Sequence, residues 1–284
     1  MLSRNKGIFS SEILVPLVGF IISAVVIHIW YTVSIRPAAE DFQIANRVRA
    51  LNAGEEGFKP QRSLAVIMKD PEQEIEMILW VWATILLTWK LVQVAGERKL
   101  LKHDFVGARP GERIIPEEAL DRYKELKNSV DATPRWRDRL LPDFLLAALH
   151  RFHATRSVHD ASSAVKDRAE LVADNLDSTL SLIRYVAWAI PAVGFIGTVR
   201  GIGDALAQAD RAIKGDLTGV TDSLGLAFNS TLVALVLSMI LMFMLHALQA
   251  RQEALILELQ NYCREKLVDI MKVPTTEETS QLLT

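Results

Sequence analysis

Two apolar stretches in the C-terminal half of the chain decide the fold. Residues 190–206 read IPAVGFIGTVRGIGDAL, and residues 226–248 read LAFNSTLVALVLSMILMFMLHAL. Each belongs to an apolar run long enough to cross a membrane, which takes about 20 residues. A short polar connection separates the two runs. The pattern therefore predicts an antiparallel transmembrane hairpin that carries one threonine in each arm, Thr198 and Thr231.

The two threonines are expected to lie at the same depth. If the first arm leaves the membrane near Leu206 and the second re-enters near Asp222, Thr198 is eight residues deep and Thr231 is nine. At a rise of about 1.5 Å per residue, both hydroxyls lie roughly 12–14 Å below one surface. An unpartnered hydroxyl is costly in hydrocarbon. Two of them at one level therefore indicate a polar path.

Small residues recur on one face of each arm. The first arm carries Gly194, Thr198, Gly201 and Ala205, with Gly197 beside them, and the second carries Ala227, Thr231, Ala234 and Ser238. Such rows let helix backbones approach closely, and ordinary tight packing is one explanation of the pattern. The other is a space for a partner helix or a file of water. We expect the rows to join copies of the chain, and Thr198, Thr231 and Ser238 to line an ion pathway.

The hairpin resembles the channel subunits of the MotA/TolQ/ExbB proton channel family. The first arm matches the family's P-x-x-G-x-x-G-T-V-x-G pattern through Pro191, Gly194, Gly197, Thr198, Val199 and Gly201. The second arm matches the A-L-x-x-T-x-x-G-L pattern through Ala227, Thr231 and Leu235, with Phe228 and Ala234 in place of the usual leucine and glycine. The resemblance covers roughly residues 160–272.

This resemblance implies an assembly and a function. In the family, five such subunits surround two copies of a single-span partner of the MotB/TolR/ExbD kind, which carries the proton-accepting aspartate. Ion flow through the complex drives work outside the inner membrane. The chain is therefore expected to be an ion-channel subunit, with protons preferred, of a lipid-embedded bacterial stator or motor complex. The alternative is a non-conducting oligomeric membrane scaffold with the same fold.

Four apolar spans are expected along the whole chain. They cover about residues 13–35, 77–95, 182–206 and 224–248. Helical periodicity precedes the third span and continues past the fourth, so the predicted fold is an all-α polytopic membrane protein whose last two helices extend into the cytoplasm. Arg4 and Lys6 favour a cytoplasmic N-terminus, and an even number of spans then places both termini in the cytoplasm.

These spans suggest the domain boundaries. We expect an N-terminal transmembrane hairpin over residues 1–96 with an external loop at 36–74, a cytoplasmic helical segment at 97–159, the channel domain at 160–273 and a disordered tail at 274–284. Within the cytoplasmic segment, Pro116 followed by two glutamates is typical of the first turn of a helix.

The spans offer few groups that could bind a proton. Hydroxyls relay hydrogen bonds but do not titrate in the useful range. Arg200 departs from the family pattern, and an arginine within a span needs a partner, for which Asp204 at i+4 is the first choice. Glu76 and Asp222 are expected at the ends of spans. The missing acid is therefore expected from the single-span partner.

Composition excludes several other functions. The net charge of −2 gives no sign of nucleic-acid binding. The single cysteine, Cys263, excludes an intramolecular disulfide and fits a reducing compartment. The sequence contains no recognisable arrangement of nucleophile, base and orienting group, and no convincing set of metal ligands. We therefore expect neither an enzyme nor a bound cofactor or metal.

Overall fold

The computed structural model describes residues 11–53, 63–108 and 111–273. These residues form helices and no strand, which confirms the predicted all-α polytopic fold. They fall into two compact units, each made of two stretches of chain. Unit 1 consists of Met1–Trp89 and Ser181–His246, and unit 2 of Lys90–Leu180 and Ala247–Thr284. The units differ from the predicted domain boundaries because the predicted channel domain contributes to both.

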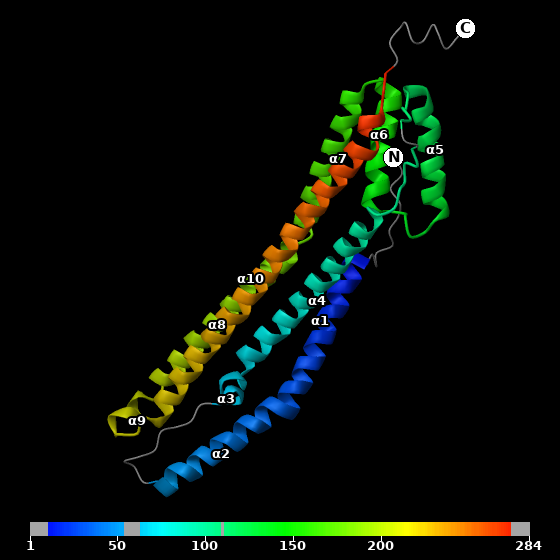
Figure 1. Cartoon of the computed structure of the whole chain (residues 1–284). Coiled ribbons are helices and arrows are strands. Elements are labelled where there is room, and N and C mark those ends of the chain that lie inside the picture. Colours follow the sequence, from blue (N-terminus) through cyan, green and yellow to red (C-terminus); the bar gives the residue numbers. More distant parts are fainter. Residues whose placement is uncertain (1–10, 54–62, 109–110, 274–284) are drawn as a thin grey trace, which may run out of the picture. The chain divides into compact units, whose positions relative to one another are not determined.

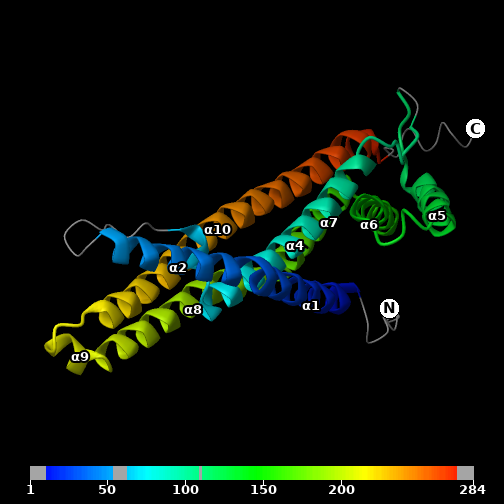
Figure 2. The same cartoon turned by 90° about the horizontal axis from the view of Figure 1, so that it is seen from below.

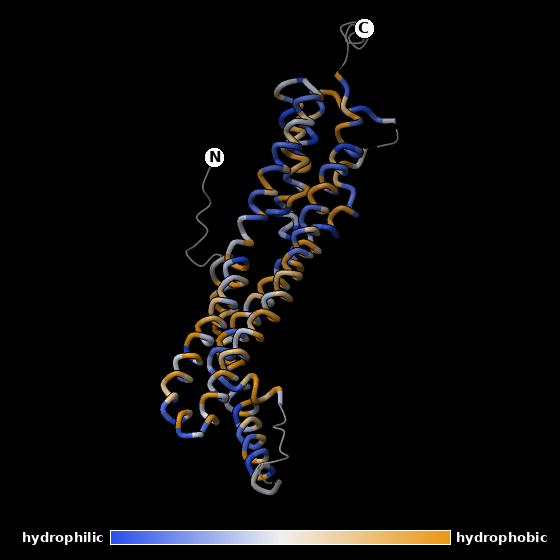
Figure 3. Tube along the Cα trace, turned by 90° about the vertical axis from the view of Figure 1, so that its left-hand side faces the viewer, coloured by the Kyte–Doolittle hydropathy of each residue, from blue (hydrophilic) through white to orange (hydrophobic). Residues whose placement is uncertain are grey.

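The helices that lie wholly in unit 1 are two long apolar ones, α1 (Ser11–Trp30) and α8 (Ser181–Leu206), the polar helix α2 (Arg36–Ala53), and three short elements. The short elements are the π-helical stretch η1 (Tyr31–Ile35), α3 (Leu64–Met68) and α9 (Ala209–Ile213) (Figure 1). Two further helices, α4 (Pro71–Leu100) and α10 (Thr218–Lys266), begin in unit 1 and end in unit 2. The hydrophobic colouring of Figure 3 follows these helices for several turns, as expected where a helix faces lipid.

Four helical stretches of the described chain are long and apolar enough to cross a membrane. They are Leu14–Arg49, Pro71–Leu100, Val158–Leu206 and Thr218–Ile270. Each covers all or nearly all of one of the four predicted spans, so the chain is a multi-pass membrane protein. The last of them is one long helix for most of its length, as the continued periodicity predicted.

The predicted external loop over residues 36–74 is instead largely helical where the structure describes it. Residues 36–53 continue the first helix as α2, and residues 54–62 lie outside the described part of the chain. Pro37 would interrupt an α-helix because it lacks a backbone N–H and its ring crowds the preceding turn. The widened turn of η1, in which the N–H of Arg36 bonds to the carbonyl of Tyr31, precedes the proline, and the helix continues through it.

The first and second spans pack through an aromatic side chain of α4. The indole nitrogen of Trp82 donates to the carbonyl of Pro16 at 2.8 Å, and its ring lies edge-on to Phe20 at 5.1 Å. The indole also lies against Gly19, where an added Cβ would be in ordinary van der Waals contact with the ring at 3.5 Å. A neighbouring span thus binds the backbone near the helix-interior proline of α1.

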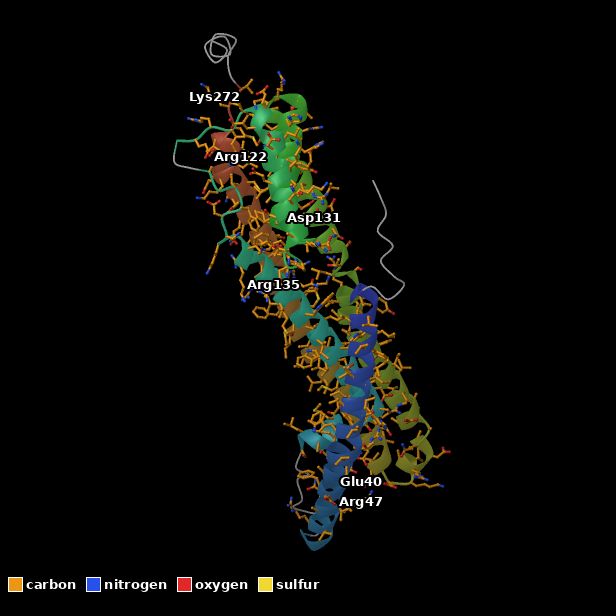
Figure 4. All side chains as sticks on the ribbon, turned by 90° about the vertical axis from the view of Figure 1, so that its right-hand side faces the viewer. Glu40, Arg47, Arg122, Asp131, Arg135 and Lys272 are labelled. Atoms are coloured by element: carbon orange, nitrogen blue, oxygen red, sulfur yellow. The ribbon has the colours of Figure 1, made fainter. Side chains whose placement is uncertain are left out.

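Unit 2 has a small core of its own. Its helices are α5 (Pro116–Ala132), α6 (Leu140–Thr155), α7 (Val158–Ser178) and the 3₁₀ turn η2 (Val268–Ile270), with the ends of α4 and α10. Apolar side chains of α6 are fully buried, and they include Leu141, Phe144, Leu145 and Phe152. Charged side chains such as Arg122, Asp131 and Arg135 mark the polar surface of this unit (Figure 4).

Backbone hydrogen bonds connect sequence-distant parts of unit 2. Ile114 pairs with the segment after η2, donating to the carbonyl of Ile270 and accepting from Lys272, both at 2.9 Å. The hydroxyl of Tyr262 donates to the carbonyl of His103 at 2.9 Å and accepts from the N–H of Phe105. These bonds attach the segment after α4 to the end of α10. Cys263, the neighbour of Tyr262, is fully buried in this unit.

The burial of Cys263 makes a testable prediction. A thiol with no exposed surface is a small apolar side chain and is inert until the structure around it opens. We expect a maleimide reagent to leave the folded protein unlabelled and to label one thiol per chain after denaturation. Rapid labelling in mild detergent, measured by intact mass, would contradict the packing of unit 2.

Candidate functional site

Helices α8 and α10 lie side by side in unit 1 and are joined by α9 (Figures 1 and 2). Their contact uses the predicted small residues. A Cβ added to Gly194 would lie 2.5 Å from the Cβ of Ala234, and one added to Gly201 would lie 2.8 Å from the Cβ of Ala227. Real Cβ atoms do not approach so closely, so only glycine fits at these two positions.

This contact changes the interpretation of the small residues. The sequence led us to expect that these rows join copies of the chain, or leave space for a partner helix or water. The structure fills them from within, since Gly194, Gly201 and Ala205 on α8 and Ala227 and Ala234 on α10 are buried in the single chain. The physical reason is that a short connection joins α10 to α8 and holds the two helices antiparallel. The small residues of α8 therefore face α10 of the same chain.

The close approach brings the two threonines together. The hydroxyls of Thr198 and Thr231 are within hydrogen-bonding distance of each other. Thr198 can also donate to the carbonyl of Ala227 at 3.1 Å or of Gly194 at 3.3 Å, and Thr231 can donate to that of Gly194 at 3.1 Å. The predicted equal depth of the two hydroxyls therefore agrees with a direct contact.

The hydroxyl pair can rearrange without moving its heavy atoms. Two hydroxyls bring only two protons, whereas each has a backbone carbonyl and the other hydroxyl as acceptors. At any moment one hydroxyl can donate to the other, or both can donate to the backbone. Such a pair can pass a hydrogen bond along the helix contact, but it cannot hold an extra proton itself.

Two serines flank this pair on α10. Ser238, which we predicted on the ion pathway, donates to the carbonyl of Ala187 at 2.9 Å and so fastens α10 to α8. Ser230 is fully buried and donates to the carbonyl of Gly194 or Ala227, at 3.2 and 3.1 Å. The sequence analysis missed Ser230, although its place beside Thr231 was the available signal.

Arg200 has a different partner from the one expected. Its guanidinium donates to the carboxylate of Glu72, at the start of α4, with an Nη2–Oε2 distance of 2.8 Å. Asp204, the predicted partner, is exposed. A basic residue four positions before an acid is the weaker helical arrangement. Glu72 competes better because its side chain is only 9% exposed and its charge needs compensation.

Gly197 makes the approach of Glu72 feasible. A Cβ at this glycine would lie 3.1 Å from the Cγ of Glu72 and 2.7 Å from the Cβ of Ser230. The absent side chain therefore leaves space that Glu72 of α4 and Ser230 of α10 both border, one residue away from Thr198. Asp70, just before α4, is a further acid near Arg200. Burial raises the pKa of its carboxyl and so favours the neutral acid, while Lys69 and Arg200 oppose that rise.

A second ion-paired glutamate, Glu74, follows Glu72 two positions later on α4. The carboxylate of Glu74 contacts Nη2 of Arg36 and Nδ1 of His28, each at 2.6 Å. The carboxylate is buried, whereas the histidine ring is mostly exposed. Neither His28 nor Glu74 was among the site residues predicted from the sequence. Three glutamates at alternate positions, directly before an apolar span, were the missed signal.

Fold and site together define a class of protein. The chain is a polytopic helical membrane protein in which an antiparallel pair of apolar helices holds two hydroxyls between them and an arginine–glutamate pair beside them. Buried polar groups in spans are rare and mark ion or substrate pathways. The class is therefore that of membrane transport proteins.

The comparisons give the family. Residues 137–261 match the model of the MotA/TolQ/ExbB proton channel family, and this confirms the resemblance for the part of the chain that holds the hydroxyl pair. Over these residues the chain is similar to the family, and the match supports a subunit of proton-channel type. Neither a curated protein nor a solved structure matches it. Helices α1 to α4 lie outside the matched residues.

The glycine contacts predict a strong difference between two neighbouring positions of α8. Gly201→Leu should destabilise the protein by about 1–3 kcal/mol, because the new side chain would overpack against α10. Gly203→Leu is the matched control, since a Cβ there meets nothing within 4 Å. Unfolding in a denaturing detergent titration measures both. Equal stability of the two variants would contradict the helix contact.

The Arg200–Glu72 pair predicts a non-additive effect. Arg200→Ala should cost about 1–2 kcal/mol by leaving a buried carboxylate unpaired, with the size limited by the partial exposure of the arginine. Adding Glu72→Gln should restore part of that loss. Asp204→Ala should change stability little. If Asp204→Ala destabilised the protein more than Arg200→Ala did, and Glu72→Gln restored no stability to Arg200→Ala, Asp204 would be the partner of Arg200 instead.

Proposed function

We propose that the chain is the ion-conducting subunit of an inner-membrane stator complex, which couples ion flow, with protons preferred, to mechanical work. The observation that carries this proposal is the contact between Thr198 and Thr231. Both threonines stand at positions of the family pattern, and both fall inside the matched residues. A paired hydroxyl site at those positions is what an ion pathway along α8 and α10 requires.

The proposed complex includes further copies and a second protein. Apolar side chains remain exposed on α8 and α10 in the single chain, for example Phe195, Val199, Phe228 and Met239. They would face lipid, other copies of the chain in a homopentamer, and the span of a MotB/TolR/ExbD-like partner dimer. Leu226 stands where the TolQ and ExbB branches commonly have an acid, so this chain has no titratable group at that position. In the proposed complex, an aspartate of the partner next to the threonines would supply one.

The proposed location is the bacterial inner membrane with both termini in the cytoplasm. Unit 2 carries the many charged residues of α5 and α7, and α10 reaches it through a segment rich in glutamate and arginine. A polar unit of this kind would remain on the side of the membrane where it is made. The four apolar helices then give an even number of crossings.

The hydroxyls provide the test of this function. Thr198→Val and Thr231→Val keep the side-chain shape but remove the relay, so each should abolish proton uptake by vesicles that contain the chain and its co-purified partner. Native mass measurement is the control, and should give the same pentameric complex for both variants and the unchanged protein. Undiminished uptake in both valine variants would refute the pathway.

The same measurement separates the alternative, a non-conducting scaffold. A scaffold would form the same oligomer but show no proton uptake with or without the threonines. It would also have no need of an aspartate-bearing partner. Co-purification of a single-span protein with an aspartate in its span, and a loss of uptake when that aspartate becomes asparagine, would therefore favour the channel.

A further inference from the structure

The start of α4 contains a group of buried polar atoms that the hydroxyl pathway does not use. Gln73 and Glu76 have no exposed surface, and neither has Tyr31 of η1. Among the described residues, none donates a hydrogen bond to or accepts one from the carboxyl oxygens of Glu76, the amide of Gln73 or the hydroxyl of Tyr31. Buried polar atoms without partners are costly, so each of them needs a physical explanation.

These side chains belong to one site. Gln73 and Glu76 are three positions apart on α4, and Glu72 is four positions before Glu76, so all three share a helix face. Tyr31 lies close enough to Glu74 and Glu76 to interact with both charges. It also opens the π-helical turn, and such turns are frequent at functional sites.

The charges around Glu76 leave its carboxyl uncompensated. Glu72 has Arg200 and Glu74 has Arg36 with His28, at distances of 2.6–2.8 Å. Glu76 has no such cation among the described residues, and the like-charged Glu72 acts on its carboxyl electrostatically. An isolated carboxylate in an apolar interior is unfavourable by several kcal/mol. A proton or a small cation must therefore neutralise it.

Burial restricts what that ligand can be. The oxygens of Glu76 have no exposed surface, so a side chain of a second subunit cannot reach them without a rearrangement. The described residues also contain no cluster of three or more histidine, cysteine, aspartate or glutamate side chains suited to a metal ion. A proton meets both conditions, because it needs no space and no set of ligands.

We propose that Glu76 is a proton-binding carboxyl of this chain, held among Gln73, Tyr31 and Glu72 beside the α8–α10 hairpin. Glu72 connects the two places, since it shares a helix face with Glu76 and contacts α8 at Gly197, next to Ser230 and Thr198. Uptake converts the carboxylate to the neutral acid, and release returns the same proton, so no co-reactant is needed. This inference deepens the proposed function and rests on it only for the use of the proton in transport.

Infrared spectroscopy of the full-length protein in lipid tests the site without requiring transport. The carbonyl stretch of a protonated carboxyl is separate from that of a carboxylate. We expect this signal to persist at a pH where exposed glutamates are ionised, and to lose one group per chain in Glu76→Gln. Glu40→Gln, at an exposed position of α2 in the same unit (Figure 4), should retain it. An unchanged signal in Glu76→Gln would overturn the proposal.

Two further arms complete the experiment. The titration is repeated in sodium and in potassium salts of equal strength, and a signal lost only in sodium would replace the proton by a bound sodium ion. If Glu76→Gln does not fold, Glu76→Asp is measured, and its signal should shift in frequency, whereas an unshifted signal would overturn the proposal. Proton uptake is then assayed separately. A complex that takes up no protons but keeps the Glu76 signal would refute the proposed function and leave this site established.

Discussion

The close approach of α8 and α10 is the constraint on which the rest of the channel hairpin depends. The two backbones can meet only because Gly194 and Gly201 present no Cβ to Ala234 and Ala227. In a membrane, such contact supplies packing that the hydrophobic effect cannot, because lipid is as apolar as the side chains it would replace. The same proximity puts each threonine hydroxyl within reach of the other and of the opposite backbone. Close packing and the hydroxyl pair therefore arise from one contact, and a bulky residue in the row would remove both.

Gly197 extends this constraint to a third helix. Its missing side chain admits Glu72 from α4 beside Ser230 from α10, and the carboxylate then pairs with Arg200. An unpaired arginine in a span would be costly, and here the carboxylate of Glu72 compensates its charge. The hairpin found in the family match is thus joined to helices outside that match by a charge pair. This pair holds the N-terminal helices to the hairpin by electrostatic attraction in addition to packing.

The sequence was sufficient for the features that follow from periodicity and composition. The four spans and the long last helix could be predicted, and the expected equal depth of Thr198 and Thr231 agrees with their contact, because a helix rises by a constant amount per residue. The partner of Arg200 could not be predicted, since Glu72 is 128 positions away and the competition between it and Asp204 is decided by burial. The helical course of residues 36–53 was missed for a related reason. Pro37 signals a break, and the widened turn that accommodates it has no sequence signature that we could recognise.

The acids of α4 show how a sequence pattern can be correct locally and still mislead. Acidic residues in a first turn are favourable next to the helix dipole, which explains their presence without any function. That explanation covers Glu72 and Glu74, both of which also have cationic partners. It does not cover Glu76, which lies beyond the first turn, is fully buried and finds no cation among the described residues. The dipole falls off within one turn, so the burial of Glu76 needs a separate cause, and a bound proton provides one. A channel subunit with its own acid would depend less completely on the partner's aspartate than the sequence alone implied.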